Sequence, residues 1–294
     1  MKLAGRLYGI LLPKVYMAGK QDVVGTYITD LFISGFYFPG ISWGGLLIGI
    51  GLGILFGAIC YSLYWTPILA KPYPWAIIAV STILTWVAIC FIQVPLQSLT
   101  SRALNIFWDQ TVLMRWILLA IIPQILYSGL VQEGSKMVPI VFFWWRKGKK
   151  LDPKTGLVLG AVAGLGFGVF EAVWIHNSIF TSGWDWNASV GTTGLIFGLL
   201  PFWERFFTVA FHTASSAIAG WGLAKGRGWQ FYLIVSLAHA LLNYSVVLYT
   251  ANYLDKMQVS IYVAVLSLIT TAVALWLRYN KETAGHDTCI SIST

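Results

Sequence analysis

Four side chains able to accept or transfer protons lie within apolar stretches of the chain, namely Glu133, Glu171, His212 and His239. An ionisable side chain at bilayer depth costs roughly 2.5–3.5 kcal/mol, so such residues usually face a polar cavity. Carboxylates beside imidazoles in a water-poor pocket support general acid and base chemistry. Such a glutamate can take a proton from water, and a histidine or asparagine can stabilise the oxyanion of peptide hydrolysis.

The four residues are expected at one depth. Each lies 10–14 residues from a helix end beside a basic loop, which corresponds to roughly 15–21 Å at the α-helical rise. Residues three, four or seven apart share a helix face. Three further side chains therefore lie on the same helix faces as these residues: Phe167 beside Glu171, Arg205 beside His212, and Asn243 beside His239. We predict one polar pocket shared by four helices.

Each residue also has a structural interpretation. A single intramembrane histidine can bond a carbonyl of a neighbouring helix, and Glu133 with Lys136 can form an ion pair at i, i+3. Arg205 can pair with Glu204 or extend to the outer interface. Four titratable groups in one layer make this interpretation the weaker one. No function is predicted for residues near the outer helix ends, which are His176, Asn177 and Asp185.

Zinc is the competing use of the same side chains. His212, His239 and Glu171 could form a catalytic zinc site, although HExxH is absent and no spacing is diagnostic. We therefore expect no cofactor, with zinc as the alternative. The three cysteines, Cys60, Cys90 and Cys289, form no CxxC pair and are interpreted as packing residues.

Composition indicates an all-α polytopic membrane protein. Of 294 residues, 57% are hydrophobic and 10% are charged, whereas soluble domains carry about 25% charged residues. The net charge of +8 comes from Lys and Arg in short loops between apolar runs, which is typical of an orientation signal. We therefore expect no nucleic-acid partner. No cleavable signal peptide is predicted, because the first long apolar run begins near Trp43.

The chain divides into four regions: an interfacial segment (1–42), scaffold transmembrane helices (43–110), a catalytic-type core (111–250), and a last helix with a basic tail (251–294). Seven or eight spans are expected, the first two at 43–65 and 74–96.

Two prolines are expected to interrupt helices. The apolar run at 111–145 would make a helix of roughly 52 Å, so we predict a break or a kink between Pro123 and Gly129, giving a hairpin or one long tilted helix. A second break is expected at Pro201, with a new helix from about Trp203. The basic loops at 146–154 and 224–228 should be cytoplasmic, and the C-terminus with them. The side of the N-terminus stays open.

The motifs QEGSK, GLGFGVFE, RFFTVAFHTASSAIAGWG and HALLN occur in this order between about 130 and 245. They resemble the successive motifs of PrsW-type intramembrane proteases, which are similar to the CAAX prenyl proteases, the abortive-infection membrane proteases and the Aph subunit of gamma-secretase. The resemblance implies cleavage of a transmembrane protein substrate, as in the first cut of a membrane-bound anti-sigma factor during regulated signalling. It also implies a bacterial cytoplasmic membrane.

The resemblance assigns motif positions to these residues. Glu133 matches the second carboxylate of a paired-glutamate motif that is followed by a basic residue, here Lys136. Glu171 matches the acidic residue of the second motif, His212 matches the third-motif histidine after Arg205, and His239 with Asn243 matches the last motif. Gln132 stands where the family has the first glutamate. An amide cannot take a proton, and adjacent helical residues point about 100° apart, so position 133 is no simple substitute.

We therefore predict an intramembrane endopeptidase in which Glu133 or Glu171, with His212, activates water. His239 and Asn243 would stabilise the oxyanion. Its partners would be a transmembrane protein substrate and membrane lipids, and the oligomeric state stays open. Gln132 favours an alternative, a non-catalytic scaffold that binds transmembrane helices or lipids. A proton-coupled transporter is a further alternative, although the two halves show no inverted repeat.

Overall fold

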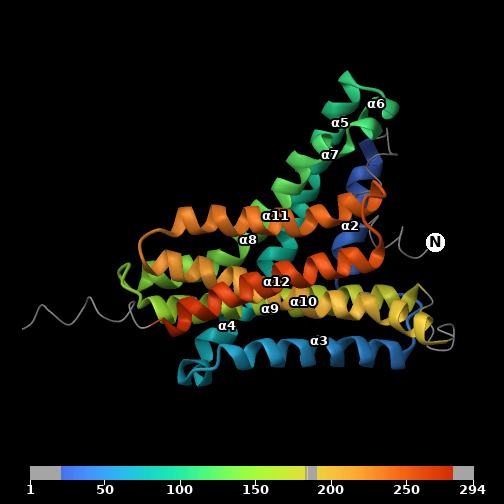
Figure 1. Cartoon of the computed structure of the whole chain (residues 1–294). Helices are drawn as coiled ribbons and strands as arrows, with labels where there is room; N and C mark the ends of the chain where they lie inside the picture. The colour runs from blue at the N-terminus through green and yellow to red at the C-terminus, as the bar shows by residue number, and fades with distance from the viewer. Residues whose placement is uncertain (1–20, 183, 185–190, 281–294) are drawn as a thin grey trace, which may run out of the picture.

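The protein is a bundle of long helices. The computed structural model describes residues 21–182, 184 and 191–280, and this part contains no strand. Its elements are α2 (Gln21–Ser34), α3 (Trp43–Leu63), η2 (Pro67–Ala70), α4 (Pro72–Ala88), η3 (Ile89–Gln93), α5 (Val94–Phe107), α6 (Gln110–Arg115), α7 (Ile117–Ala120), α8 (Ile122–Arg146), α9 (Pro153–Thr181), α10 (Gly191–Ala224), α11 (Gly228–Thr250) and α12 (Lys256–Tyr279). Helices α3 and α9–α12 run alongside one another, while α5, α6 and α7 project from the bundle as an arm (Figure 1).

Six segments of the described chain are long and apolar enough to cross a membrane, at 43–63, 72–107, 117–146, 153–181, 228–250 and 256–279. The protein is therefore an integral membrane protein, as its composition indicates. Helix α10 has 34 residues but is not one of the six. Its run of charged and hydroxyl side chains between Glu204 and Ser216 lowers its mean hydropathy.

Helix α9 is the central element. Of its most apolar part 83% is buried, against 22–44% in the other five spans. It packs against α10 along a seam of glycines, where a methyl group on Gly160 or Gly164 would overlap the carbonyl oxygen of Ser216 or His212. Small residues allow membrane helices to approach this closely. Helix α3 covers another face of α9 with glycines four residues apart, Gly45, Gly49, Gly53 and Gly57.

Both predicted helix breaks are wrong. Helix α8 continues without interruption through Gly129, and the chain bends before it, at Trp116 and Ile121. Pro123 lies in the first turn of α8, where a missing N–H breaks no helical bond. Residues 117–146 form one span, so the hairpin alternative is wrong as well.

Helix α10 likewise runs through Pro201. The indole of Trp184 donates to the carbonyl of Gly198 at 3.1 Å, beside the Phe197 carbonyl that Pro201 leaves without its usual partner. Membrane helices tolerate prolines within them.

The second predicted span is longer than expected. The chain stays helical from Pro72 to Phe107, with one π-helical turn at Ile89–Gln93. Helix α2 packs on this segment, because the indole of Trp86 donates to the carbonyl of Phe32 at 3.2 Å. Cys60 and Cys90 are free and buried, as expected. Four features lie outside the described residues: the first 20 residues, Asp185, Cys289 and the tail beyond Asn280.

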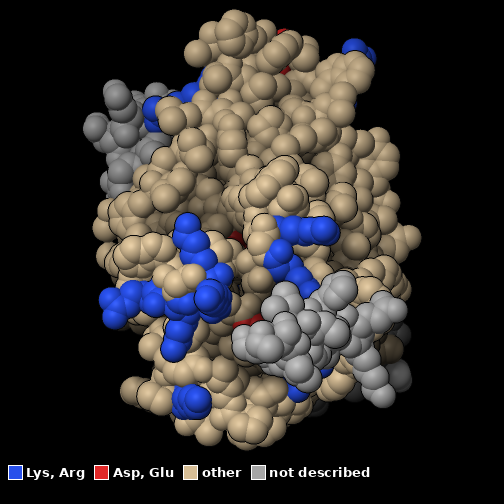
Figure 2. Space-filling model, turned by 90° about the vertical axis from the view of Figure 1, so that its left-hand side faces the viewer, with Lys and Arg blue, Asp and Glu red and all other residues tan. Residues whose placement is uncertain are grey.

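Positive charge gathers at one end of the bundle (Figure 2). The loops from α8 to α9 and from α10 to α11 lie there, and they carry most of these charges. Arg278, near the end of α12, donates to the carbonyls of Leu63 and Trp65 at 2.9 and 2.6 Å. The ends of α3 and α12 therefore belong to the same face.

Candidate active site

Glu133 is the centre of a hydrogen-bond network inside the bundle. Its carboxylate is fully buried, and its Oε1 lies 2.7 Å from Lys136 Nζ and 2.8 Å from His239 Nδ1. The hydroxyls of Ser215 and Ser216 donate to its two oxygens at 3.2 and 3.5 Å. Three of these four contacts reach Oε1, so α8, α10 and α11 all meet at this one oxygen.

Lys136 connects Glu133 to the histidine on α10. Its side chain is fully buried, and its Nζ lies 2.7 Å from Glu133 Oε1 and 3.1 Å from His212 Nδ1. An ammonium can only donate, so His212 Nδ1 accepts and the ring carries its proton on Nε2. The expected ion pair of Glu133 and Lys136 is therefore present, and it belongs to the larger network.

Glu171 lies on the other side of the His212 ring. Its Oε2 is 3.2 Å from His212 Nε2 and 3.4 Å from an Arg205 guanidinium nitrogen. Arg205 also pairs with Glu204 at 2.7 Å. Glu171 Oε1 accepts no hydrogen bond from the residues that the structure describes. One oxygen of this carboxylate is therefore held while the other stays available.

Close helix contacts bring these groups together. Gly164 and Gly168 allow α9 to approach α10 beside His212, and Phe167 places its ring edge against that imidazole, with centroids 5.3 Å apart. Gly129 likewise allows α8 to approach α11 closely, since a Cβ at this position would overlap a backbone carbonyl of α11. As a result, the His212 and His239 rings lie 5.0 Å apart.

Two of the expected residues lie beside the network rather than in it. Gln132 Nε2 donates to Gln93 Oε1 at 3.0 Å, and Asn243 Nδ2 donates to Ser128 Oγ at 2.9 Å. The residues that the network joins are Glu133, Lys136, Glu171, Arg205, His212 and His239, with Phe167 packed on it. His176 is buried elsewhere, with Nδ1 3.2 Å from the carbonyl of Gly49.

Sequence reasoning missed Ser215, Ser216 and Gln93. A signal existed for Ser216, which lies four residues after His212 and so shares its helix face. Gln93 gave none, because it sits in a π-helical turn and its partner is 39 residues away.

Glu133, His212 and His239 could hold a metal ion, since one ligand atom from each lies within 4.8 Å of the others. A carboxylate and two imidazoles form a known catalytic zinc set. The Lys136 ammonium already contacts Glu133 and His212, so these two ligands converge on a positive charge. The set fits zinc, but it contains Glu133 where the sequence suggested Glu171. Glu171 instead bonds the far ring nitrogen of His212, a position that orients a metal-binding histidine.

Fold and site together define a polytopic membrane protein with a buried glutamate and histidine site suited to hydrolysis. The model of the PrsW family of intramembrane metalloproteases matches residues 73–273, more than half of the 294-residue chain. The chain belongs to this intramembrane protease family, as its motifs predicted. No curated protein and no solved structure matches it. The further similarity to CAAX prenyl proteases and to the Aph subunit stays a prediction.

Proposed function

We propose that the protein is an intramembrane endopeptidase that cleaves a transmembrane or membrane-associated protein with water as the nucleophile. The observation that carries this proposal is the convergence of Glu133, His212 and His239, with Glu171 bonded to His212, inside the helix bundle. Burying two carboxylates and two imidazoles in this layer is costly. Packing alone does not require such a network, whereas general acid and base chemistry does.

Glu171 is the better placed of the two candidate bases. Glu133 Oε1 already accepts from Lys136, His239 and Ser215, while Glu171 Oε1 is available. In the proposed reaction, Glu171 takes a proton from water as the water oxygen adds to the scissile carbonyl carbon. The carbon–nitrogen bond then breaks, and the amine leaves with that proton. His212 holds Glu171 in position through Oε2.

Of the pair expected to stabilise the oxyanion, only His239 lies in the network. Its Nδ1 bonds Glu133, which leaves Nε2 as the atom that could face substrate. Asn243 donates to Ser128 on α8 and contributes to helix contact there. In a mechanism without a metal, we therefore assign the oxyanion role to His239 alone.

Zinc held by Glu133, His212 and His239 would supply a Lewis acid that polarises the scissile carbonyl. The family description as metalloproteases and the donor set both support zinc over the absence of any cofactor. Metal analysis of the purified protein, combined with chelator sensitivity of cleavage, distinguishes this mechanism from a glutamate mechanism. Chelator-resistant cleavage by metal-free protein would exclude the zinc assignment.

We also propose that α10 spans the membrane, which makes seven spans. It lies antiparallel to α9 along most of its length, since Gly156 packs on Gly220 and Gly168 on Val209. The positively charged end of the bundle would face the cytoplasm. The C-terminus, which follows Arg278 at that end, would be cytoplasmic. A bacterial cytoplasmic membrane is the expected location.

Co-expression with candidate single-span substrates tests the function. We expect His212→Ala and Glu171→Gln each to lower cleavage at least about 100-fold, as loss of general acid or base catalysis does. His176→Ala is the matched control, since His176 is equally buried but lies outside the network. Wild-type rates in both site variants would remove the proposed site.

A non-catalytic scaffold is the second candidate, and Gln132 is the observation that favours it. The amide occupies the position of the first family glutamate and is hydrogen-bonded to Gln93. A scaffold would need the histidines for assembly rather than for chemistry. An intact complex isolated with a protein carrying both His212→Ala and His239→Ala would exclude this candidate.

A further inference from the structure

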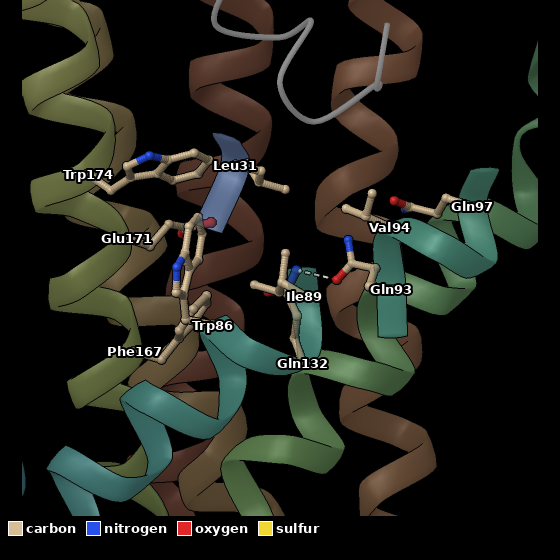
Figure 3. Close-up of a pocket in the computed structure, with 10 residues that line it drawn as sticks. All are labelled: Leu31, Trp86, Ile89, Gln93, Val94, Gln97, Gln132, Phe167, Glu171 and Trp174. Carbon is tan, nitrogen blue, oxygen red and sulfur yellow. Dashed lines mark hydrogen bonds between the residues drawn. The ribbon is translucent and has the colours of Figure 1, made fainter. Parts of the chain in front are cut away.

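A small cavity lies beside the network, between α9 and the segment formed by α4, η3 and α5 (Figure 3). Its volume is about 30 Å³. Aromatic rings of Trp86, Phe167 and Trp174 form one side, and Gln132 and Glu171 contribute polar atoms. The cavity therefore adjoins the carboxylate to which the base role is assigned.

Three residues that line this cavity, Gln132, Glu171 and Gln97, each have a side-chain oxygen that accepts no hydrogen bond from the described residues. Gln132 is 3% exposed, and its Oε1 is buried without a hydrogen bond. Its Nε2 is held by Gln93 at 3.0 Å, which fixes the orientation of the amide (Figure 3). Glu171 uses Oε2 for His212 and Arg205, so its Oε1 is the second acceptor. A buried acceptor without a donor, as Gln132 Oε1 is here, is costly, and native proteins supply the donor.

The size of the cavity restricts what that donor can be. A bound water needs roughly 10–15 Å³ on this measure and two to four polar partners. The cavity thus has room for about two waters, and a peptide segment does not fit. Each water can donate two hydrogen bonds, so two waters can supply all three available acceptors.

We propose that this cavity holds ordered water that bridges Gln132 Oε1 and Glu171. The water site is a property of the folded protein and needs no substrate. Its role rests on the proposed function: it keeps the nucleophile within reach of the base inside the membrane, where bulk water is scarce. Gln132 then acts as a positioning residue, because its amide oxygen offers the water an acceptor beside Glu171.

Hydroxyl-radical labelling, which modifies buried side chains only where water is bound nearby, tests the site directly. We expect labelling of Trp86 and Trp174 in the wild-type protein, although both are at most 5% exposed. Val94→Leu places an extra methylene in the cavity, and Gln132→Met removes one acceptor at similar length. Each should reduce this labelling at least about fivefold.

The matched control is Gln124→Met. Gln124 is also a buried glutamine of α8, but it bonds Ser101 and does not line the cavity. Labelling in this variant should equal that of the wild type. Absence of labelling in the wild type, or equal labelling in Val94→Leu, would overturn the water site.

Cleavage measured on the same variants tests the role of the water. We expect Val94→Leu to lower kcat about tenfold with an unchanged KM, since the substrate does not enter this cavity. Normal kcat in a variant that has lost the labelling would overturn the supply role. Failure of the protease proposal has a different signature, namely wild-type labelling at the two tryptophans with cleavage of no substrate.

Discussion

Replacing Lys136 with methionine should destabilise the protein through Glu133. The change keeps most of the side-chain length but removes the ammonium that lies 2.7 Å from Glu133 Oε1 and 3.1 Å from His212 Nδ1. Both charged side chains are fully buried. Removing one partner of a buried ion pair costs about 3–5 kcal/mol, because the remaining charge has no compensation. The contacts of Glu133 with His239 and Ser215 persist, so we expect the lower end, about 3 kcal/mol.

A double-mutant cycle separates this electrostatic effect from simple loss of packing. Glu133→Gln should be destabilising too, since it leaves the Lys136 ammonium buried without its carboxylate. The double variant removes both charges, so its loss should be smaller than the sum of the two single losses by about 2 kcal/mol or more. Additive losses would show that the two groups do not stabilise each other and would refute the reasoning.

Zinc provides a second readout of the same position. If Glu133, His212 and His239 bind a metal, the Lys136→Met protein should bind it more tightly, because no ammonium competes for Glu133 and His212. Zinc at 100 times its Kd would then add about 2.7 kcal/mol to the unfolding free energy. The assay is reversible unfolding in bicelles for the four proteins, with and without zinc. Equal stabilisation of the wild type and Lys136→Met by the same zinc concentration would refute the competition.

Three further predictions follow from the packing, the family motif and the charge distribution. Gly164→Ala should cost about 1–3 kcal/mol by forcing α9 from α10, whereas Gly51→Ala, which meets open space, should be neutral or stabilising in the same unfolding assay. Gln132→Glu should raise cleavage of a single-span substrate about tenfold by adding a second base; an unchanged rate would show that this position does not limit catalysis. The cysteine of Lys150→Cys should react with membrane-impermeant thiol reagents only from the cytoplasmic side, and that of Tyr253→Cys only from the opposite side. The reverse pattern would contradict the proposed orientation, in which the positively charged end of the bundle faces the cytoplasm.

The positions of the titratable residues could be predicted because they depend on local regularities. Helical rise and face are the same in any membrane helix, so counting from the basic loops brought Glu133, Glu171, His212 and His239 to one layer. The structure shows these four residues in one network. The helical membrane class followed from composition in the same way.

The contacts that could not be predicted from the sequence depend on neighbours far along the chain. Helix α10 continues through Pro201, and Trp184 from the preceding segment donates to the carbonyl of Gly198 near that proline. Asn243 has the right helix face but reaches Ser128, a residue on a helix 115 positions earlier. The link between Lys136 and His212 also joins two helices, and it decides which ring nitrogen carries the proton.

The same network explains why glycine is required where α9 meets α10. A buried glutamate is tolerated at this depth only if donors from several helices reach it, and each donor side chain has a fixed length. His212 reaches Glu171 at 3.2 Å because the two backbones touch about two turns earlier on α9, at Gly164. Any side chain at Gly164 would move the imidazole away from Glu171 and from the Lys136 ammonium at once, since His212 bonds both. Gly164 therefore determines the chemistry of the site as directly as the charged residues do, although it offers no functional group.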